Sequence, residues 1–275
     1  MLSAPFRGWR AGVPPDSFDS QVCVLTGAAG GIGRELAREL TGRGAKLVIS
    51  GRRGNALSDL RTGLPAGSVA AAVAGDLRDE KVRAELAATA SAAGATVLVN
   101  LSGANAFGML ERQTSDDIAE LIETNLVAPM QLTRLLLPHL LAQQVASIVN
   151  VGSVLGEIGH PGYTAYCASK FGLRGFSEAL RRELADTSVT VQYLGPRTTR
   201  TTMNDAAAVQ MNEMLGNSVD EPAEVAKWIA DAMAEGRLRG NFGWPERFFC
   251  RINALLPGVV DGAIAGKLAV VKRFA

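Results

Sequence analysis

Short hydrophobic runs alternate with longer amphipathic segments along most of the chain. The runs are rich in β-branched residues and are almost continuously apolar. This pattern is typical of parallel strands that are covered by helices on both faces of a sheet. The runs predicted as strands are 21–26, 46–50, 69–76, 96–100, 147–153 and 190–195.

The segments between these runs have apolar positions at helical spacing. The predicted helices are 32–42, 53–62, 79–92, 115–143, 164–186 and 221–235. Because strands and helices alternate, the connections are expected to cross over between parallel strands. We therefore predict an α/β fold over residues 21–245, a single Rossmann-type doubly wound parallel sheet with helices on both faces.

Both ends of the chain lie outside this alternation. Residues 1–20 contain three prolines and no continuous apolar run, which predicts a poorly structured N-terminal arm and no secretory signal. Residues 246–275 predict an amphipathic, basic C-terminal extension of two helices broken near Pro257. Its apolar positions are Phe249, Ile252, Leu256, Val260, Ile264 and Leu268. This face would pack on the protein or on a second subunit, or lie on an anionic membrane.

Composition narrows the classes of partner. A chain of 275 residues that is 47% hydrophobic and 20% charged can form one large domain. The net charge of +1, with scattered basic residues, gives no strong field for a phosphate backbone, so no nucleic-acid partner is expected. Three cysteines without CxxC spacing fit a reducing compartment, and we expect a cytoplasmic protein without a metal site.

The first strand runs directly into the glycine-rich segment TGAAGGIGREL, which opens a helix. Glycines let the backbone turn sharply and approach a pyrophosphate, whose charge then meets free N–H groups at the helix N-terminus. A plain tight turn is the alternative, which the strand before and the helix after it make less favourable. The residues expected to contact a dinucleotide here are Thr26, Gly27, Gly31, Ile32 and Gly33.

The end of the second strand indicates which dinucleotide is bound. Gly51 stands where an NAD enzyme places an acidic residue on the ribose, and Arg52 and Arg53 follow it. A guanidinium can bind a 2′-phosphate through charge-assisted hydrogen bonds, which favours NADP(H). The alternative is that both arginines are solvated at the start of a helix.

Three polar residues in SVLGEIGHPGYTAYCASK predict acid/base chemistry. Tyr166 and Lys170 are four residues apart and share one face of a helix, while Ser153 ends the preceding strand. A neighbouring ammonium favours the phenolate and is expected to lower the tyrosine pKa, and Ser153 can hold the reacting oxygen.

Together these motifs resemble the short-chain dehydrogenases/reductases, over about residues 21–201. The resemblance implies that Tyr166 is the acid/base, that Lys170 binds the nicotinamide ribose, and that Asn125 completes a proton relay. It also implies that Asp76 and Leu77 contact the adenine, that Asn100 and Gly103 line the cofactor cleft, and that the nicotinamide carboxamide is held by Pro196, Thr199 and Thr201.

Two segments depart from the family pattern. The usual NNAG is NLSG here, with Leu101 and Ser102 between Asn100 and Gly103, and the usual Pro-Gly after the sixth strand is Pro196-Arg197. Arg197 would either reach a cofactor phosphate or point to solvent.

The remaining features concern the substrate and the assembly. Residues 202–222 are the expected substrate lid, with an apolar face of Met203, Met211 and Met214, and they predict a hydrophobic carbonyl or alcohol substrate. Small residues along the helix 164–186 predict a homo-oligomer, a dimer or tetramer, or close packing within the chain. The alternative function is a non-catalytic NADP(H)-binding sensor or docking protein.

Overall fold

The computed structural model describes residues 17–275. The predicted N-terminal arm lies outside the described residues except for 17–20, which join the domain. Phe18 is completely buried in the main core, and its backbone N–H donates to the Arg43 carbonyl oxygen at 2.7 Å. A single aromatic residue in a polar stretch gives no periodic signal, so the sequence pattern did not indicate this contact.

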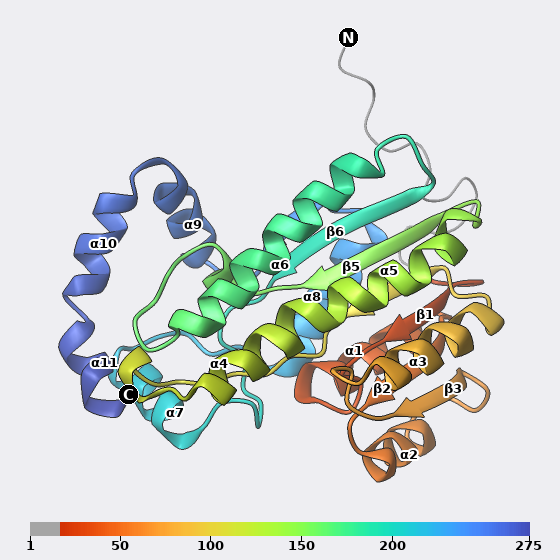
Figure 1. Cartoon of the computed structure of the whole chain (residues 1–275), viewed down its shortest axis with the longest axis horizontal. Helices are drawn as coiled ribbons and strands as arrows, with labels where there is room; N and C mark the ends of the chain where they lie inside the picture. Colours follow the sequence, from red (N-terminus) through yellow and green to blue (C-terminus); the bar gives the residue numbers. More distant parts are fainter. Residues whose placement is uncertain (1–16) are drawn as a thin grey trace.

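One parallel sheet of seven strands organises the described chain, and its order β3-β2-β1-β4-β5-β6-β7 confirms the doubly wound prediction (Figure 1). The strands are β1 (Val22–Leu25), β2 (Lys46–Gly51), β3 (Val69–Ala74), β4 (Val97–Asn100), β5 (Ala146–Val151), β6 (Val189–Gly195) and β7 (Arg239–Asn241). The edge strand β7 was not predicted, because its three residues Arg-Gly-Asn carry no apolar pattern.

Helices cover both faces of the sheet. The helices α1 (Gly31–Gly42), α2 (Gly54–Thr62) and α8 (Pro222–Ala234) bury apolar side chains in one core. The helices α3 (Glu80–Ala92), α5 (Ala128–Leu141) and α6 (Thr164–Glu183) form the opposite core, on the face toward the viewer in Figure 1. Each core meets strand residues that point alternately to its own side.

The predicted helix 115–143 is interrupted. Helix α4 (Ser115–Ile122) begins with a capping box of Thr114 and Asp117, and a π-helical turn, Glu123–Val127, joins it to α5. A π-turn inserts an extra residue into the helical repeat and often marks a functional site. Here it contains the buried Asn125.

The C-terminal extension forms three helices at one end of the molecule, beside α7 (Ala206–Met214), which lies in the segment expected to form a substrate lid (Figure 1). They are α9 (Glu246–Leu255), α10 (Pro257–Ala265) and α11 (Leu268–Phe274). The break before Pro257 agrees with the prediction, while the second break, at Gly266, was missed. Within the described part of the chain, no helix is long and apolar enough to cross a bilayer.

Candidate active site

A cavity of about 860 Å³ lies at the carboxyl ends of the strands, where the connections from β1 and β4 turn to opposite sides. This is the place where open α/β sheets bind ligands. Most of the predicted site residues line it: Gly27, Gly31, Ile32, Gly33, Arg52, Arg53, Asp76, Leu77, Gly103, Ser153, Tyr166, Lys170, Pro196, Thr199 and Thr201.

The loop after β1 needs its glycines. Gly27 has a φ of +66°, which side-chain-bearing residues rarely adopt. A Cβ on Gly33 would lie 2.2 Å from the Gly27 carbonyl oxygen, so the first turn of α1 could not pack against the loop. The resulting cradle presents the N-terminus of α1 to the cavity, as a pyrophosphate site requires.

Two residues predicted to contact the cofactor instead form hydrogen bonds that hold the NLSG segment in place. Thr26 is buried, and its Oγ1 accepts hydrogen bonds from the backbone N–H groups of Leu101 and Ser102 at 2.9 and 3.0 Å. Asn100 is buried as well, and its Nδ2 donates to Asn150 Oδ1 at 2.8 Å. Neither is among the residues that line the cavity, because both side chains point into the sheet contacts that hold the NLSG segment.

One end of the cavity is basic. Arg52 and Arg53 line it beside Gly51, which supplies no carboxylate. Arg78, which the sequence analysis did not single out, also lines this end and forms an ion pair with Asp76 at 2.7 Å. Hydrogen bonding to Arg78 lowers the pKa of the Asp76 carboxyl, and the charge of Arg52 adds to this effect.

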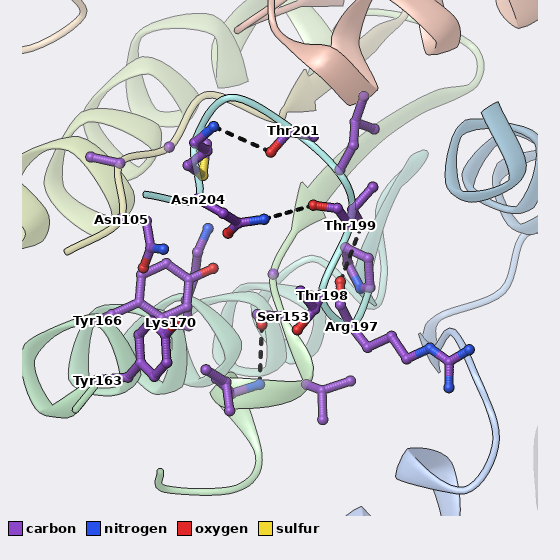
Figure 2. Close-up of a pocket in the computed structure, with 18 of the residues that line it drawn as sticks. Asn105, Ser153, Tyr163, Tyr166, Lys170, Arg197, Thr198, Thr199, Thr201 and Asn204 are labelled. Carbon is purple, nitrogen blue, oxygen red and sulfur yellow. Dashed lines mark hydrogen bonds between the residues drawn. The ribbon is translucent and has the colours of Figure 1, made fainter. Parts of the chain in front are cut away.

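Figure 2 shows Tyr166 and Lys170 side by side on α6, with Ser153 on the neighbouring strand end. The Lys170 Nζ lies 5.8 Å from the centre of the Tyr166 ring and donates to the Val151 carbonyl oxygen at 3.4 Å. The Ser153 Oγ accepts from the Leu155 N–H at 3.1 Å. The three polar groups therefore converge on the cavity as predicted.

Burial controls the protonation of this pair. Desolvation raises the pKa of Tyr166 to about 12, although a hydrogen bond with Ser153 acts in the opposite direction. Desolvation also lowers the pKa of Lys170 to about 8. The expectation that the tyrosine pKa is lowered is therefore wrong for this structure, because desolvation of the phenol raises the pKa by more than the hydrogen bond with Ser153 lowers it.

Asn125 does not line the cavity, but it holds one of its walls. Its Oδ1 accepts from the Ala104 N–H at 2.8 Å, and its Nδ2 donates to the Ala104 carbonyl oxygen at 3.0 Å and to Ser169 Oγ at 3.0 Å. The π-turn thus fixes the strand-end segment beside Gly103 to α6.

Tyr193 is a site residue that sequence analysis missed. Its buried hydroxyl donates to the Ser153 carbonyl oxygen at 3.2 Å and accepts from the Ser153 N–H at 3.3 Å. A Cβ on Gly152 or Gly156 would lie 2.2 Å from this phenol, so the two glycines make room for it. The register of β5 and β6 brings this tyrosine beside a serine 40 positions away, which no local pattern encodes.

Arg197 forms ion pairs within the chain and does not simply point to solvent. Figure 2 shows its side chain extending away from Tyr166 and Lys170. Its guanidinium donates to both carboxylate oxygens of Asp220, at 2.7 and 2.8 Å, to Glu246 at 2.8 Å and to the Trp244 carbonyl oxygen at 3.0 Å. The loop after β6, the lid segment and the C-terminal extension therefore meet at one side chain.

Apolar side chains from three segments line another part of the cavity wall. Leu155, Ile158 and Tyr163 lie near Tyr166 and Lys170, Met203 and Met211 come from the segment 202–222, and Phe249, Val260 and Ile264 come from α9 and α10. Met214 is half exposed and is not among the lining residues, so the predicted methionine face is only partly correct. Leu256 is also exposed, because it lies in the turn between α9 and α10.

Comparison with known proteins gives consistent matches. The family model of the short chain dehydrogenases matches residues 21–212. Nodulation protein G of Rhizobium sp. (strain N33) is 34% identical over 215 residues, which cover 74% of this chain and 86% of that protein. The 3-oxoacyl-(acyl-carrier-protein) reductase FabG of Escherichia coli (strain K12) is 32% identical over 196 residues, 69% of this chain and 78% of the reductase.

Solved structures agree with this fold. A short chain dehydrogenase/reductase from Burkholderia phymatum in complex with NAD superposes with a TM-score of 0.79 at 25% identity, covering 89% of this chain and 96% of the other. A short chain dehydrogenase from Burkholderia cenocepacia J2315 in complex with NADP has a TM-score of 0.72 at 26% identity, covering 81% and 95%. These two neighbours bind different forms of the nicotinamide dinucleotide.

Proposed function

The chain belongs to the short-chain dehydrogenase family, and we propose that it is an NADP(H)-dependent oxidoreductase acting on a hydrophobic carbonyl or alcohol. The observation that carries the proposal is the convergence of Ser153, Tyr166 and Lys170 on a cavity whose far end holds Arg52 and Arg53. A proton donor, a hydrogen-bond donor and a dinucleotide cradle in one cavity are the requirements of hydride transfer at a carbonyl carbon.

The shape and charge of the cavity fit NADP(H). The cradle of Gly27, Gly31 and Gly33 would hold the pyrophosphate, and the guanidinium of Arg52, with Arg53 and Arg78 nearby, would bind the 2′-phosphate. Gly103 lies beside Lys170, since a Cβ there would be 3.7 Å from its Nζ, and both residues line the part of the cavity where the nicotinamide ribose would bind. When bound, the dinucleotide supplies or accepts the hydride.

Tyr166 performs the proton transfer in this proposal. With a pKa of about 12 its phenol is protonated at neutral pH, so in reduction it donates its O–H proton to the substrate oxygen as the carbonyl carbon gains hydride. Ser153 donates a hydrogen bond to the same oxygen. The Lys170 ammonium stabilises the phenolate that remains until a proton returns from solvent, and oxidation of an alcohol reverses each transfer.

The walls around the catalytic pair favour an apolar substrate. Contacts from α9 and α10 add Phe249, Val260 and Ile264 to a pocket already lined by Leu155 and Ile158. Apolar pockets with a few convergent polar groups bind ligands whose polar reacting atom is carried by a hydrophobic body.

We keep two further predictions as proposals, a cytoplasmic location and a homo-oligomer of two or four chains. Met130 on α5 and Phe171 on α6 are exposed, and Gly175 has open space around it, as an intersubunit contact would need. Gly172, in contrast, is explained within the chain, because a Cβ there would lie 2.7 Å from Leu126.

The alternative is a non-catalytic protein that binds NADP(H) as a sensor. A sensor needs the phosphate cradle and could use Lys170 to bind the ribose, but it has no need of a phenol and a serine hydroxyl arranged for proton transfer. Both hypotheses predict cofactor binding, so turnover is the discriminating measurement.

A panel of aliphatic, aromatic and alicyclic carbonyls and alcohols, followed by cofactor absorbance, tests the proposal. Tyr166→Phe should lower kcat by about 10² or more, because it deletes the transferable proton. Its Kd for NADPH, measured by fluorescence, should stay within a few fold of the original value. Turnover of Tyr166→Phe near that of the native protein would contradict the mechanism, and tight NADPH binding without turnover on the whole panel would favour the sensor.

A further inference from the structure

Exposed apolar side chains are concentrated along α9 and in the turn that joins it to α10. Among the described residues, six of the 13 exposed large hydrophobic side chains lie between positions 244 and 259. Leaving out Phe249, which also lines the cavity, we call the other five the tip patch: Trp244, Phe248, Leu255, Leu256 and Val259. Isolated exposed apolar residues are normal, but a cluster of this kind marks an interaction surface.

The inner face of the extension already packs on the rest of the protein, so the tip patch is not needed to bury the extension against the core. Cys250 and Val260 are buried against Val154 and Ile158. The Asn253 Nδ2 donates to the Glu157 carbonyl oxygen at 2.8 Å, and the ion pair of Glu246 with Arg197 fixes the start of α9. The protein therefore holds the outer face of α9 away from its own core.

That outer face combines apolar and basic side chains. Phe248, Arg251 and Leu255 recur at intervals of three and four and share one side of α9, next to Arg247. All four are exposed. Residues 246–275 contain five basic and two acidic residues. Of the two acidic residues, Glu246 is paired with Arg197, which leaves Asp261 as the exposed carboxylate of this segment.

We propose that the tip patch docks the protein onto an anionic lipid membrane surface. Aromatic and aliphatic side chains flanked by arginines suit the boundary between acyl chains and headgroups, where apolar groups enter and cations meet lipid phosphates. A second copy of this chain fits less well, because a symmetric contact through this patch would bring Arg247 and Arg251 of both copies together.

Docking would also place the substrate cavity close to the lipid. Val260 and Ile264 line the cavity from the inner side of α10, while Val259 belongs to the tip patch on its outer side. This part rests on the proposed function, since it implies that apolar substrates dissolved in the membrane reach the catalytic pair. The docking itself requires no turnover, so its failure and the failure of the proposed function are distinguishable.

Flotation of the full chain with vesicles tests the proposal. The native protein should float with vesicles of phosphatidylcholine and phosphatidylglycerol, and binding should weaken with rising salt. Leu255→Asp/Leu256→Asp should weaken binding by at least about tenfold, because it places carboxylates where apolar groups enter the lipid. Arg247→Gln/Arg251→Gln should weaken it by about fivefold for each arginine.

Leu141→Asp is the matched control, because Leu141 is an exposed leucine at the end of α5, outside the tip patch, and this variant should bind vesicles like the native protein. Absence of binding by the native protein at low salt, or unchanged binding of the double aspartate variant, would overturn the proposal. A lower sedimentation mass of the double aspartate variant without vesicles would identify the patch as a subunit interface and would overturn it too.

Discussion

The pKa values of single residues in this site depend on how much water the surrounding residues exclude. Tyr166 and Lys170 are one helical turn apart, yet burial moves the pKa of the phenol up and that of the ammonium down. The tyrosine is thus ready to give a proton at neutral pH, and the lysine is the group whose charge changes within the working range.

This difference predicts the pH dependence of reduction. Because the pKa of Lys170 is lowered to about 8, the amine is half charged at that pH, largely charged at lower pH and progressively neutral at higher pH. The kcat/KM for carbonyl reduction should therefore fall as the pH rises through about 8, while Tyr166 keeps its proton up to about 12. Initial rates of carbonyl reduction with NADPH, measured between pH 6 and 10, give the pH at which kcat/KM falls, which can be compared with the Lys170 pKa. A Lys170→Arg variant keeps the charge, so its residual rate should show no such fall; the same fall in the variant would assign the titration to another group.

Cofactor choice is also decided by single residues. With Gly51 and Arg52 at the end of β2, NADPH should bind better than NADH by more than about tenfold. Gly51→Asp/Arg52→Ala should reverse this order, because a carboxylate that repels the 2′-phosphate replaces a guanidinium that binds it. The Cβ of the new aspartate would meet Leu57 at 3.4 Å, an ordinary contact, so the variant should fold. Equal Kd values for the two cofactors in the native protein would show that the arginines are solvated.

At the scale of elements, the sequence predicted what is local. Continuous apolar runs placed the first six strands to within about two residues at most ends, and helical spacing placed the helices between them. The π-turn around Asn125 was beyond such a pattern, because one inserted residue barely changes the apolar spacing from 115 to 143. The strand β7 was missed for a related reason, since its pairing with β6 depends on tertiary position.

The residues of the candidate site also fall into those that local sequence patterns predict and those that depend on tertiary structure. Motif residues that reach the cavity from strand ends and helix starts could be predicted, including Ser153, Tyr166 and Lys170. Tyr193 could not, because its contact with Ser153 comes from the register between two strands. The pKa of Tyr166 was predicted in the wrong direction, since spacing along a helix gives the neighbouring charge but says nothing of the water that the folded chain removes.

At the scale of the whole molecule, Arg197 connects parts of the chain that are far apart in sequence. It follows Pro196 at the cavity wall, binds Asp220 at the end of the lid segment, and binds Glu246 at the start of the C-terminal extension. The loop before α9 wraps closely around it, since a Cβ on Gly243 would lie 2.7 Å from its Cδ. One guanidinium thus joins the end of the segment 202–222 to the start of the C-terminal extension beside the cavity.

Replacing Arg197 should therefore affect both stability and substrate binding. Arg197→Met keeps much of the alkyl stem but leaves the buried Asp220 carboxylate without its partner, which should cost about 2 kcal/mol or more of the free energy of unfolding. The KM for a hydrophobic substrate should rise several fold, because the extension supplies Phe249, Val260 and Ile264 to the pocket, whereas the Kd for NADPH should change little.

The same loop provides a matched control. Arg200 forms an exposed ion pair with Glu221, so Arg200→Met should change the free energy of unfolding by about 0.5 kcal/mol or less and leave KM unaltered. Urea unfolding and steady-state kinetics on both variants give the two comparisons.

If Arg197→Met behaves like Arg200→Met in both measurements, the segment 202–222 and the extension stay in position without the guanidinium. If stability falls while KM stays constant, the contact supports folding but does not shape the substrate pocket. A loss of stability together with a raised KM is the result expected when one side chain holds both covers of the cavity in place.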